Sequence, residues 1–387
     1  MSLSLSKRMQ WMMSSEIRNM SIACKNFGGI DLSQGDSDLE VPVAVRQGAI
    51  EAVEKGINTY TAYEGIFELR KKIAYKQKQL TGIEVDPEKE IIVSSGASAA
   101  LYCAFLALLN PGDEVIVFEP YYEYYITALL AAQAKPVFVK LTPPEWTFTD
   151  EALDSVRTDK TKAILINTPA NPCGKVFEPA ELERLAKFAI HCDLFVFTDE
   201  IYEYFVYDER EHKTPAGLPG MKARTILVSG LSKTFSITGW RIGYCICDSH
   251  WAQAIGLFND FIYACAPAPL QMGVSKGLGV LDNAFFAGIC REYMQRRDKL
   301  CHALSAGGLT PYTPQGGFFV LADISNLPGD TGRQRAMSLL HQTGVACVPG
   351  EAFYHDGSGK NMGRFCFAKE DYLLDEACSR IESLSRE

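Results

Sequence analysis

The stretch ILVSGLSKTFSITGWRIG, residues 226–243, decides how the rest of the chain is interpreted. It begins with a short apolar run, Ile226-Leu227-Val228, of the kind that forms a buried parallel strand. Lys233 follows this run between small hydroxyl residues, at the place where open α/β sheets bind ligands. Because a lysine can condense with an aldehyde and then move a proton, the stretch predicts a covalent catalytic site.

Short apolar runs alternate with amphipathic, helix-like stretches from residue 91 onward. Since strands that alternate with helices form parallel sheets, we expect an α/β fold with a mostly parallel seven-stranded sheet sandwiched by helices. After about residue 275 the pattern changes to that of a smaller α+β domain with a long first helix. The predicted strands of the large sheet are 91–93, 114–118, 137–139, 164–166, 194–197, 226–228 and 244–247.

Composition excludes several classes of function. The chain has 387 residues and a formal net charge of −9, which argues against nucleic-acid binding. No apolar stretch reaches the roughly 20 residues of a membrane span. The 12 cysteines form no Cys-x-x-Cys pair, and the six histidines show no metal-ligand spacing. We therefore expect a cytoplasmic protein without a metal site, bound neither to membrane nor to nucleic acid.

Polar loops follow three further predicted strands. The segment 94–98 opens a helix with small residues, whose backbone N–H groups suit an anion, although a plain helix cap has the same appearance. The loop 167–174 is stiffened by two prolines and presents Asn171. Asp199 and Tyr202 follow the strand 194–197, where an unpaired acid is unfavourable unless a cation is bound. These loops are expected to meet around Lys233.

Taken together, these loops resemble the class I/II aminotransferases, which are fold type I enzymes dependent on pyridoxal 5′-phosphate. The resemblance extends from about Asp31 to Ala368 and rests on SGAS (95–98), NPCG (171–174), DEIY (199–202), and SKTF with GWRIG (232–243). The tail RFCFAK, residues 364–369, is most similar to the branch of kynurenine, glutamine and methionine aminotransferases and cysteine-conjugate β-lyases.

The resemblance implies a role for each residue at the cofactor. Lys233 would bind pyridoxal 5′-phosphate covalently and act as the proton carrier, with Asp199 pairing with the pyridine nitrogen and Tyr202 and Asn171 bonding the 3′-oxygen. Tyr122 would stack on the ring, with Tyr121 as the competitor. The phosphate would be held by Gly96, Ala97, Ser98, Ser232 and Arg241, and by Tyr60 of the neighbouring subunit of a homodimer.

The implied substrates are an L-α-amino acid and a 2-oxo acid, exchanged by a ping-pong reaction. Arg364 would bind the α-carboxylate, assisted by Asn171 and by the backbone N–H of Gly35. No second arginine is recognisable for a distal carboxylate. Aromatic residues near the expected pocket favour neutral, aromatic or sulfur-containing amino acids: Tyr63, Tyr121, Tyr124, Tyr263, Phe318 and Phe319.

Three alternatives stay open at this point. A carbon–sulfur β-lyase uses the same lysine, and an aspartate aminotransferase has the same motifs. A non-enzymatic regulator with this fold is disfavoured, because the chain has no basic patch for DNA. The expected organisation is an N-terminal arm with part of the small domain (1–40), a large cofactor-binding domain (41–275) and a small C-terminal domain (276–387).

Overall fold

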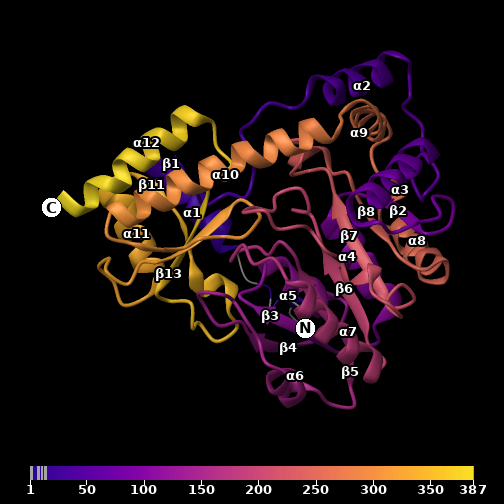
Figure 1. Ribbon diagram of the computed structural model, residues 1–387, viewed down its shortest axis with the longest axis horizontal. Coiled ribbons are helices and arrows are strands. Elements are labelled where there is room, and N and C mark those ends of the chain that lie inside the picture. Colours follow the sequence, from indigo (N-terminus) through magenta and orange to yellow (C-terminus); the bar gives the residue numbers. More distant parts are fainter. Residues whose placement is uncertain (1–2, 7–8, 10–11, 13–14, 387) are drawn as a thin grey trace.

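A seven-stranded sheet forms the centre of the larger part of the molecule in the computed structural model, which describes residues 3–6, 9, 12 and 15–386 (Figure 1). Its strands are β2 (Ile91–Ser94), β3 (Glu114–Glu119), β4 (Lys135–Lys140), β5 (Thr161–Asn167), β6 (Phe195–Asp199), β7 (Thr225–Gly230) and β8 (Gly243–Ile246). They lie in the order β2-β8-β7-β6-β5-β3-β4. Strand β8 is antiparallel to both neighbours and the other pairings are parallel, which confirms the predicted α/β sheet.

Helices cover both faces of this sheet, because successive strand residues point to opposite sides. Val115 and Val117 of β3 face a core shared with α4 (Ala97–Leu108), α5 (Glu123–Ala131) and α8 (Ser249–Tyr263). Ile116 and Phe118 face the opposite core, which contains α6 (Asp150–Val156) and α7 (Pro179–His191). At the β2 and β8 end, the sheet is covered by α2 (Val43–Glu54), α3 (Phe67–Thr81) and α9 (Ala268–Val280).

A second, antiparallel sheet lies in the C-terminal part, coloured orange to yellow in Figure 1. Its four strands have the order β12-β13-β10-β9, with β9 (Thr310–Tyr312), β10 (Phe319–Asp323), β12 (Val348–Pro349) and β13 (Met362–Cys366). The helices of this part are α10 (Asn283–Ala306), α11 (Gly332–Thr343) and α12 (Asp371–Glu382).

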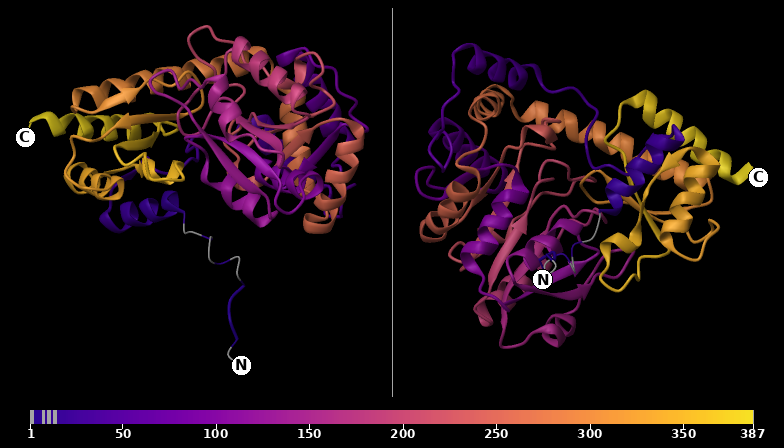
Figure 2. Two further views of the ribbon diagram at one scale, coloured as in Figure 1. Left: turned by 90° about the horizontal axis from the view of Figure 1, so that it is seen from below. Right: turned by 180° about the vertical axis from the view of Figure 1, so that it is seen from behind.

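The start of the chain belongs spatially to this C-terminal part. Helix α1 (Glu16–Phe27) packs against it (Figure 2), and β1 (Ile30–Asp31) pairs in parallel with β11 (Val345–Ala346). The segment between β1 and α2 therefore passes from the two-stranded β1–β11 sheet of the C-terminal part to the part built on the seven-stranded sheet. None of the helices in the described part of the chain is long and apolar enough to cross a membrane.

Candidate active site

One cavity of about 520 Å³ collects nearly all of the predicted site residues. Gly96 does not line the cavity itself but packs against Arg241, which does. A Cβ on Gly96 would lie 2.2 Å from Nη2 of Arg241. Tyr60 is 85% exposed and does not line the cavity of its own subunit. The predicted residues that line it are Gly35, Ala97, Ser98, Tyr122, Asn171, Asp199, Tyr202, Ser232, Lys233, Arg241 and Arg364.

Lys233 follows β7 and carries its amine into this cavity. Its Nζ donates a hydrogen bond to the carbonyl oxygen of Gly35 at 2.5 Å. Burial lowers the pKa of Lys233 to about 8, so the neutral fraction near neutral pH is far larger than that of an ordinary lysine. A neutral amine is the form that attacks a carbonyl carbon. Gly35 thus presents its carbonyl to the lysine, whereas the sequence predicted a role for its N–H.

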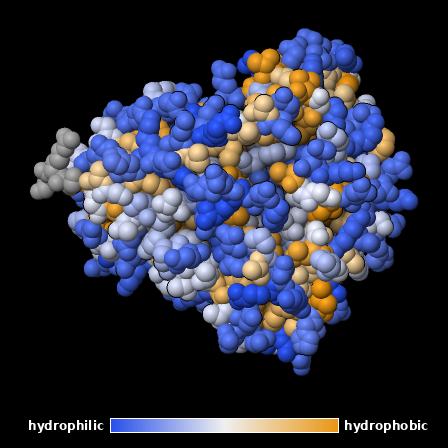
Figure 3. All heavy atoms as spheres, viewed as in Figure 1, coloured by the Kyte–Doolittle hydropathy of each residue, from blue (hydrophilic) through white to orange (hydrophobic). Residues whose placement is uncertain are grey.

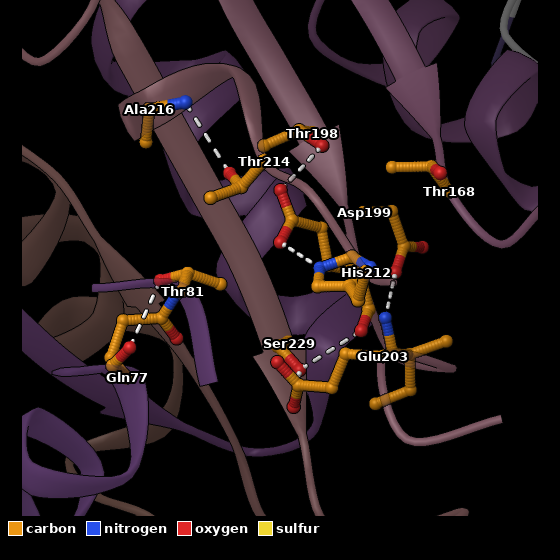
Figure 4. Close-up of polar contacts among 12 residues, drawn as sticks. Gln77, Thr81, Thr168, Thr198, Asp199, Glu203, His212, Thr214, Ala216 and Ser229 are labelled. Atoms are coloured by element: carbon orange, nitrogen blue, oxygen red, sulfur yellow. Dashed lines mark hydrogen bonds and ion pairs between the residues drawn. The ribbon is translucent and has the colours of Figure 1, made fainter. Parts of the chain in front are cut away.

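Asp199 ends β6 as a buried carboxylate held in place by two donors. The Tyr125 hydroxyl donates to its Oδ2 at 2.7 Å. The backbone N–H of Ile201 donates to its Oδ1 at 3.2 Å, and Figure 4 shows the Asp199 side chain with this contact. Burial raises the pKa of Asp199 to about 6, which is the direction expected when no cation lies close enough to offset desolvation. Within the described chain Asp199 forms no ion pair, so the site suits a bound cationic group such as a protonated ring nitrogen.

Asn167 ties the loop after β5 to the end of β6. Its Nδ2 donates to the Asp199 carbonyl at 2.9 Å, and its Oδ1 accepts from the Asn171 backbone N–H at 2.7 Å. Asn171 in turn accepts from Nη1 of Arg364 at 2.9 Å. These contacts connect the acid, the amide and the guanidinium into one hydrogen-bonded chain. The roles of Asn167 and Tyr125 were not predicted from the sequence. Asn167 begins the loop 167–174, whereas Tyr125 lies within helix α5.

Arg364 on β13 is a fully buried cation that has no acidic partner in the described part of the chain. Its Nη2 donates to the Ser33 carbonyl at 2.6 Å, and its guanidinium lies 4.2 Å from the centre of the Phe319 ring. The Nε atom is buried without a partner, and burial lowers the pKa of the group. Since a buried unpaired charge is strongly unfavourable, this arrangement calls for an anionic ligand.

The start of α4 and Arg241 form a second place for an anion. Gly96 caps α4 with φ of +87°, and Ala97 and Ser98 open the helix toward the cavity. The first N–H groups of a helix lack intrahelical partners and attract anions. Arg241, at a left-handed φ of 59°, donates to the Thr238 carbonyl at 2.9 Å, which leaves much of its fork available. Such a donor set fits a phosphate group.

Buried polar side chains support the strand ends behind Asp199 (Figure 4). Glu200 accepts from the Thr198 hydroxyl at 3.0 Å and pairs with Nε2 of His212 at 2.7 Å. Glu203 accepts from Ser229 at 2.8 Å and from Lys76 at 2.5 Å. These contacts join the segment after β6 to β7, which fixes the distance between the two strand ends that carry Asp199 and Lys233.

The aromatic residues named from the sequence differ in whether they line the cavity. Tyr122 lines the cavity, whereas Tyr121 packs in the core, 5.6 Å from the Phe138 ring. Of the other aromatic candidates, Tyr124 and Phe319 line the cavity, and Tyr63, Tyr263 and Phe318 do not.

The sequence analysis missed one wall of the cavity entirely. Ser15, Ile17 and Arg18 from the start of α1 lie there together with Glu123 of α5. No second arginine was recognisable for a distal carboxylate from the motifs, and Arg18 is an arginine of this wall that no motif indicated. No motif signals this wall, since its two halves are far apart in the sequence.

Comparison with known proteins identifies the family. The family model for aminotransferase class I and II matches residues 28–381. This chain is a class I and II aminotransferase. It is 35% identical over 390 residues to an aspartate aminotransferase from Pyrococcus abyssi, with 100% of this chain and 99% of the relative covered. It is 34% identical over 400 residues to a kynurenine–oxoglutarate transaminase from Dictyostelium discoideum, with 93% and 92% covered.

The solved structures agree with this assignment. The structure of YbdL from Escherichia coli, identified as a methionine aminotransferase, superposes on the aminotransferase with a TM-score of 0.95 and 28% identity. It covers 99% of this chain and 100% of its own. The chain is therefore a fold type I, pyridoxal 5′-phosphate-dependent transaminase, as the motifs predicted. The buried acid, the half-buried lysine and the anion cradle at α4 fit that cofactor.

Proposed function

We propose that the aminotransferase carries out its reaction in the 520 Å³ cavity, with Lys233 as its catalytic amine. One observation carries this proposal: the cavity is shared by a half-buried lysine, a buried acid and a buried arginine, each of them without an ion-pair partner in the described part of the chain. Asp199 would pair with the ring nitrogen of the cofactor, and Tyr202 and Asn171 would bond its 3′-oxygen. Tyr122 would stack on the ring, and Gly96, Ala97, Ser98, Ser232 and Arg241 would hold the phosphate.

The bound cofactor holds the amino group in transit and stabilises the electron pair released at the substrate Cα. The protein contributes binding and proton transfer. Arg364 and Asn171 hold the α-carboxylate by a planar fork and an amide. The Nζ of Lys233, with its pKa of about 8, removes the proton from the substrate Cα. The same group donates the proton back at a later stage of the amino transfer. Phe319 and Tyr122 keep water from this proton.

We further propose L-amino acids with neutral, aromatic or sulfur-containing side chains as donors, and a 2-oxo acid as acceptor. The cavity wall contains Ile17, Tyr124 and Phe319, which favour apolar side chains. Similar proteins are named for methionine and kynurenine, which is consistent with this class. Arg18 and the similarity to an aspartate aminotransferase favour aspartate as the alternative substrate.

A homodimer is proposed as the active unit, with Tyr60 of the partner subunit completing the phosphate site. Tyr60 stands 85% exposed on the loop between α2 and α3. Exposed apolar side chains gather over α2 (Figure 3), where Val43 and Val53 are 67% and 57% exposed. Apolar patches of this kind mark protein interfaces. On α8, Leu257 and Phe261 are also exposed, at 60% and 87%.

Two further proposals concern location and organisation. All 12 cysteines are free thiols, which supports a reducing, cytoplasmic location. We propose that the domains are 1–40 (arm and part of the small domain), 41–275 (large) and 276–387 (small). The pairing of β1 with β11 supports the assignment of the first segment to the small domain.

The substitution Lys233→Ala tests the catalytic assignment. It should abolish amino transfer from every donor to every 2-oxo acid, because no other buried amine lines the described cavity. Borohydride reduction of the wild type, followed by peptide mass spectrometry, should place the cofactor on Lys233. Lys276→Ala, which removes an amine on α9 paired with Glu51, is the matched control and should keep full activity. Transamination by the Lys233 variant would refute the assignment.

The same assays separate transfer from elimination. A β-lyase releases pyruvate from cysteine conjugates when no 2-oxo acid is added, whereas a transaminase needs the acceptor to turn over. We expect turnover to depend on the acceptor. A panel of donors that includes methionine, phenylalanine, kynurenine and aspartate then measures the substrate class.

A further inference from the structure

The cavity contains a carboxylate that the catalytic assignments leave without a role. Glu123, the first residue of α5, lines the cavity one position after Tyr122. The walls formed by Lys233, Asp199 and Arg241 are already assigned to the cofactor. Under the proposed function, on which this inference rests, the wall built from α1 and Glu123 is left for the substrate side chain.

Glu123 is held in a fixed position by the start of α1. The Ser15 hydroxyl donates a hydrogen bond to its Oε1, although 108 residues separate the two in the sequence. Ser15 also caps α1 by accepting from the Arg18 backbone N–H at 3.3 Å. The Glu123 carboxylate is thus fixed by its position at the start of α5 and by the hydrogen bond from α1. A side chain fixed in this way can bind a ligand group in a defined orientation.

Glu123 interacts electrostatically with Arg364, the residue proposed to bind the substrate α-carboxylate. Burial raises the pKa of this carboxyl, and the nearby Arg364 guanidinium acts in the opposite direction. Glu123 is therefore within electrostatic reach of the group proposed to bind the α-carboxylate. A substrate bound to Arg364 brings its side chain into the field of Glu123 in a partly buried space, where charges interact more strongly than in water.

We propose that Glu123 is the specificity-determining residue for the distal end of the substrate, and that it selects side chains ending in a hydrogen-bond donor over side chains ending in a carboxylate. A carboxamide N–H can donate to the Glu123 oxygen. A carboxylate of the same shape places two like charges side by side, which is unfavourable at a desolvated contact. Arg18 is the opposing group: it lies exposed on the same wall and favours a distal carboxylate.

Isosteric pairs of ligands test this selection in the holoenzyme. The kcat/KM values for glutamine and glutamate, and for asparagine and aspartate, are measured with one common 2-oxo acid. Binding of the unreactive pair glutaramate and glutarate is measured by calorimetry, which gives a readout independent of turnover. The wild type should favour the amide of each pair by about tenfold or more. Glu123→Gln should lower each ratio by about tenfold, mainly by improving the carboxylate ligands.

Glu151→Gln is the matched control. It removes the same charge from the first turn of α6, where Glu151 is exposed and does not line the cavity. Its ratios should equal those of the wild type. If Glu123→Gln does not fold, Ser15→Ala, which releases Glu123, should shift the ratios in the same direction.

Three results would overturn the inference. They are a wild type that prefers the carboxylate ligands, ratios that Glu123→Gln leaves unchanged, and a loss in Arg18→Gln that is confined to glutamate, aspartate and glutarate. The last result would assign the distal end to Arg18. Failure of the proposed function has a different signature, in which no donor is accepted at all and borohydride fixes no cofactor on Lys233.

Discussion

The carboxylate of Asp199 is less stable inside the folded protein than in water. Its pKa of about 6 stands above the ordinary value of 3.8, because burial disfavours the charged form. Folding is therefore disfavoured wherever the group is ionised. The penalty is absent well below pH 4, grows between about pH 4 and 6, and stays constant above that range. A cationic ligand at this position removes the penalty, which links cofactor binding to stability.

Asp199→Asn should separate these two effects. In the cofactor-free protein, the variant should be more stable to urea than the wild type at pH 8, by as much as about 3 kcal/mol, with a smaller difference at pH 5. Its transaminase activity should fall by about 100-fold or more, because the anion facing the ring nitrogen is lost. Equal stability of both proteins at pH 8 would contradict the proposed desolvation of Asp199.

Asp208→Asn is the control of opposite sign. Arg297 holds the pKa of Asp208 below its usual value, so the ionised form stabilises the fold. Removing that charge should destabilise the protein at pH 8, and the loss should fade as the pH falls and Asp208 becomes protonated.

At the scale of elements, the turn between β2 and α4 brings a backbone and a guanidinium unusually close. Gly96 combines a φ of +87° with space so limited that a Cβ would lie 2.2 Å from Arg241 Nη2. Gly230 is limited similarly, since a Cβ there would lie 2.9 Å from the Cα of Gly243. Close approach of backbones thus explains why glycine is used where β2, β7 and β8 meet.

Gly96→Ala should weaken cofactor binding by about tenfold or more, because the new methyl group displaces Arg241 from the phosphate. Gly112→Ala is its control: Gly112 has a φ of +89° but open space around its Cβ position. Both variants should lose about 1 kcal/mol or more of stability from the left-handed backbone. Only Gly96→Ala should raise the Kd for pyridoxal 5′-phosphate in equilibrium dialysis, and equal effects of both would disprove the clash.

Most of the large sheet and its loops could be predicted, for a physical reason. Asn171, Asp199 and Lys233 directly follow short apolar runs, and parallel strands bring the residues after them to one edge. The wall made by Ser15 and Glu123 could not be predicted, because their contact depends on how α1 packs and leaves no local periodicity. The same holds for Tyr125, whose role follows only from the distance between α5 and the end of β6.

At the scale of the whole molecule, the position of Tyr60 predicts that each active site is shared between subunits. A protomer with Tyr60→Ala and a protomer with Lys233→Ala should each be weakly active or inactive alone. After unfolding and refolding together, the mixed dimer contains one site with an intact lysine and an intact partner tyrosine. Activity should therefore reappear in the mixture, to a fraction set by the share of mixed dimers.

The controls are the same two variants refolded separately, with light scattering to confirm that both form dimers. A tyrosine acting within its own subunit would give no recovery, because every lysine-containing site would still lack its tyrosine. A monomeric wild type would contradict the shared site more directly.

The short segment between β1 and α2 contacts both cationic side chains of the site through main-chain oxygens. The Ser33 carbonyl accepts a hydrogen bond from Arg364, and the Gly35 carbonyl accepts one from Lys233. Carbonyl groups are present whatever the side chain, so these two contacts constrain the length of the segment rather than the identity of its residues. At Gly35 a separate contact favours glycine, because a Cβ there would lie 2.9 Å from the Phe319 ring. A single inserted residue would shift one oxygen out of reach and flip the direction of the next. Evolution of new specificities in this enzyme is therefore expected to proceed here by substitution, with insertions and deletions confined to other loops.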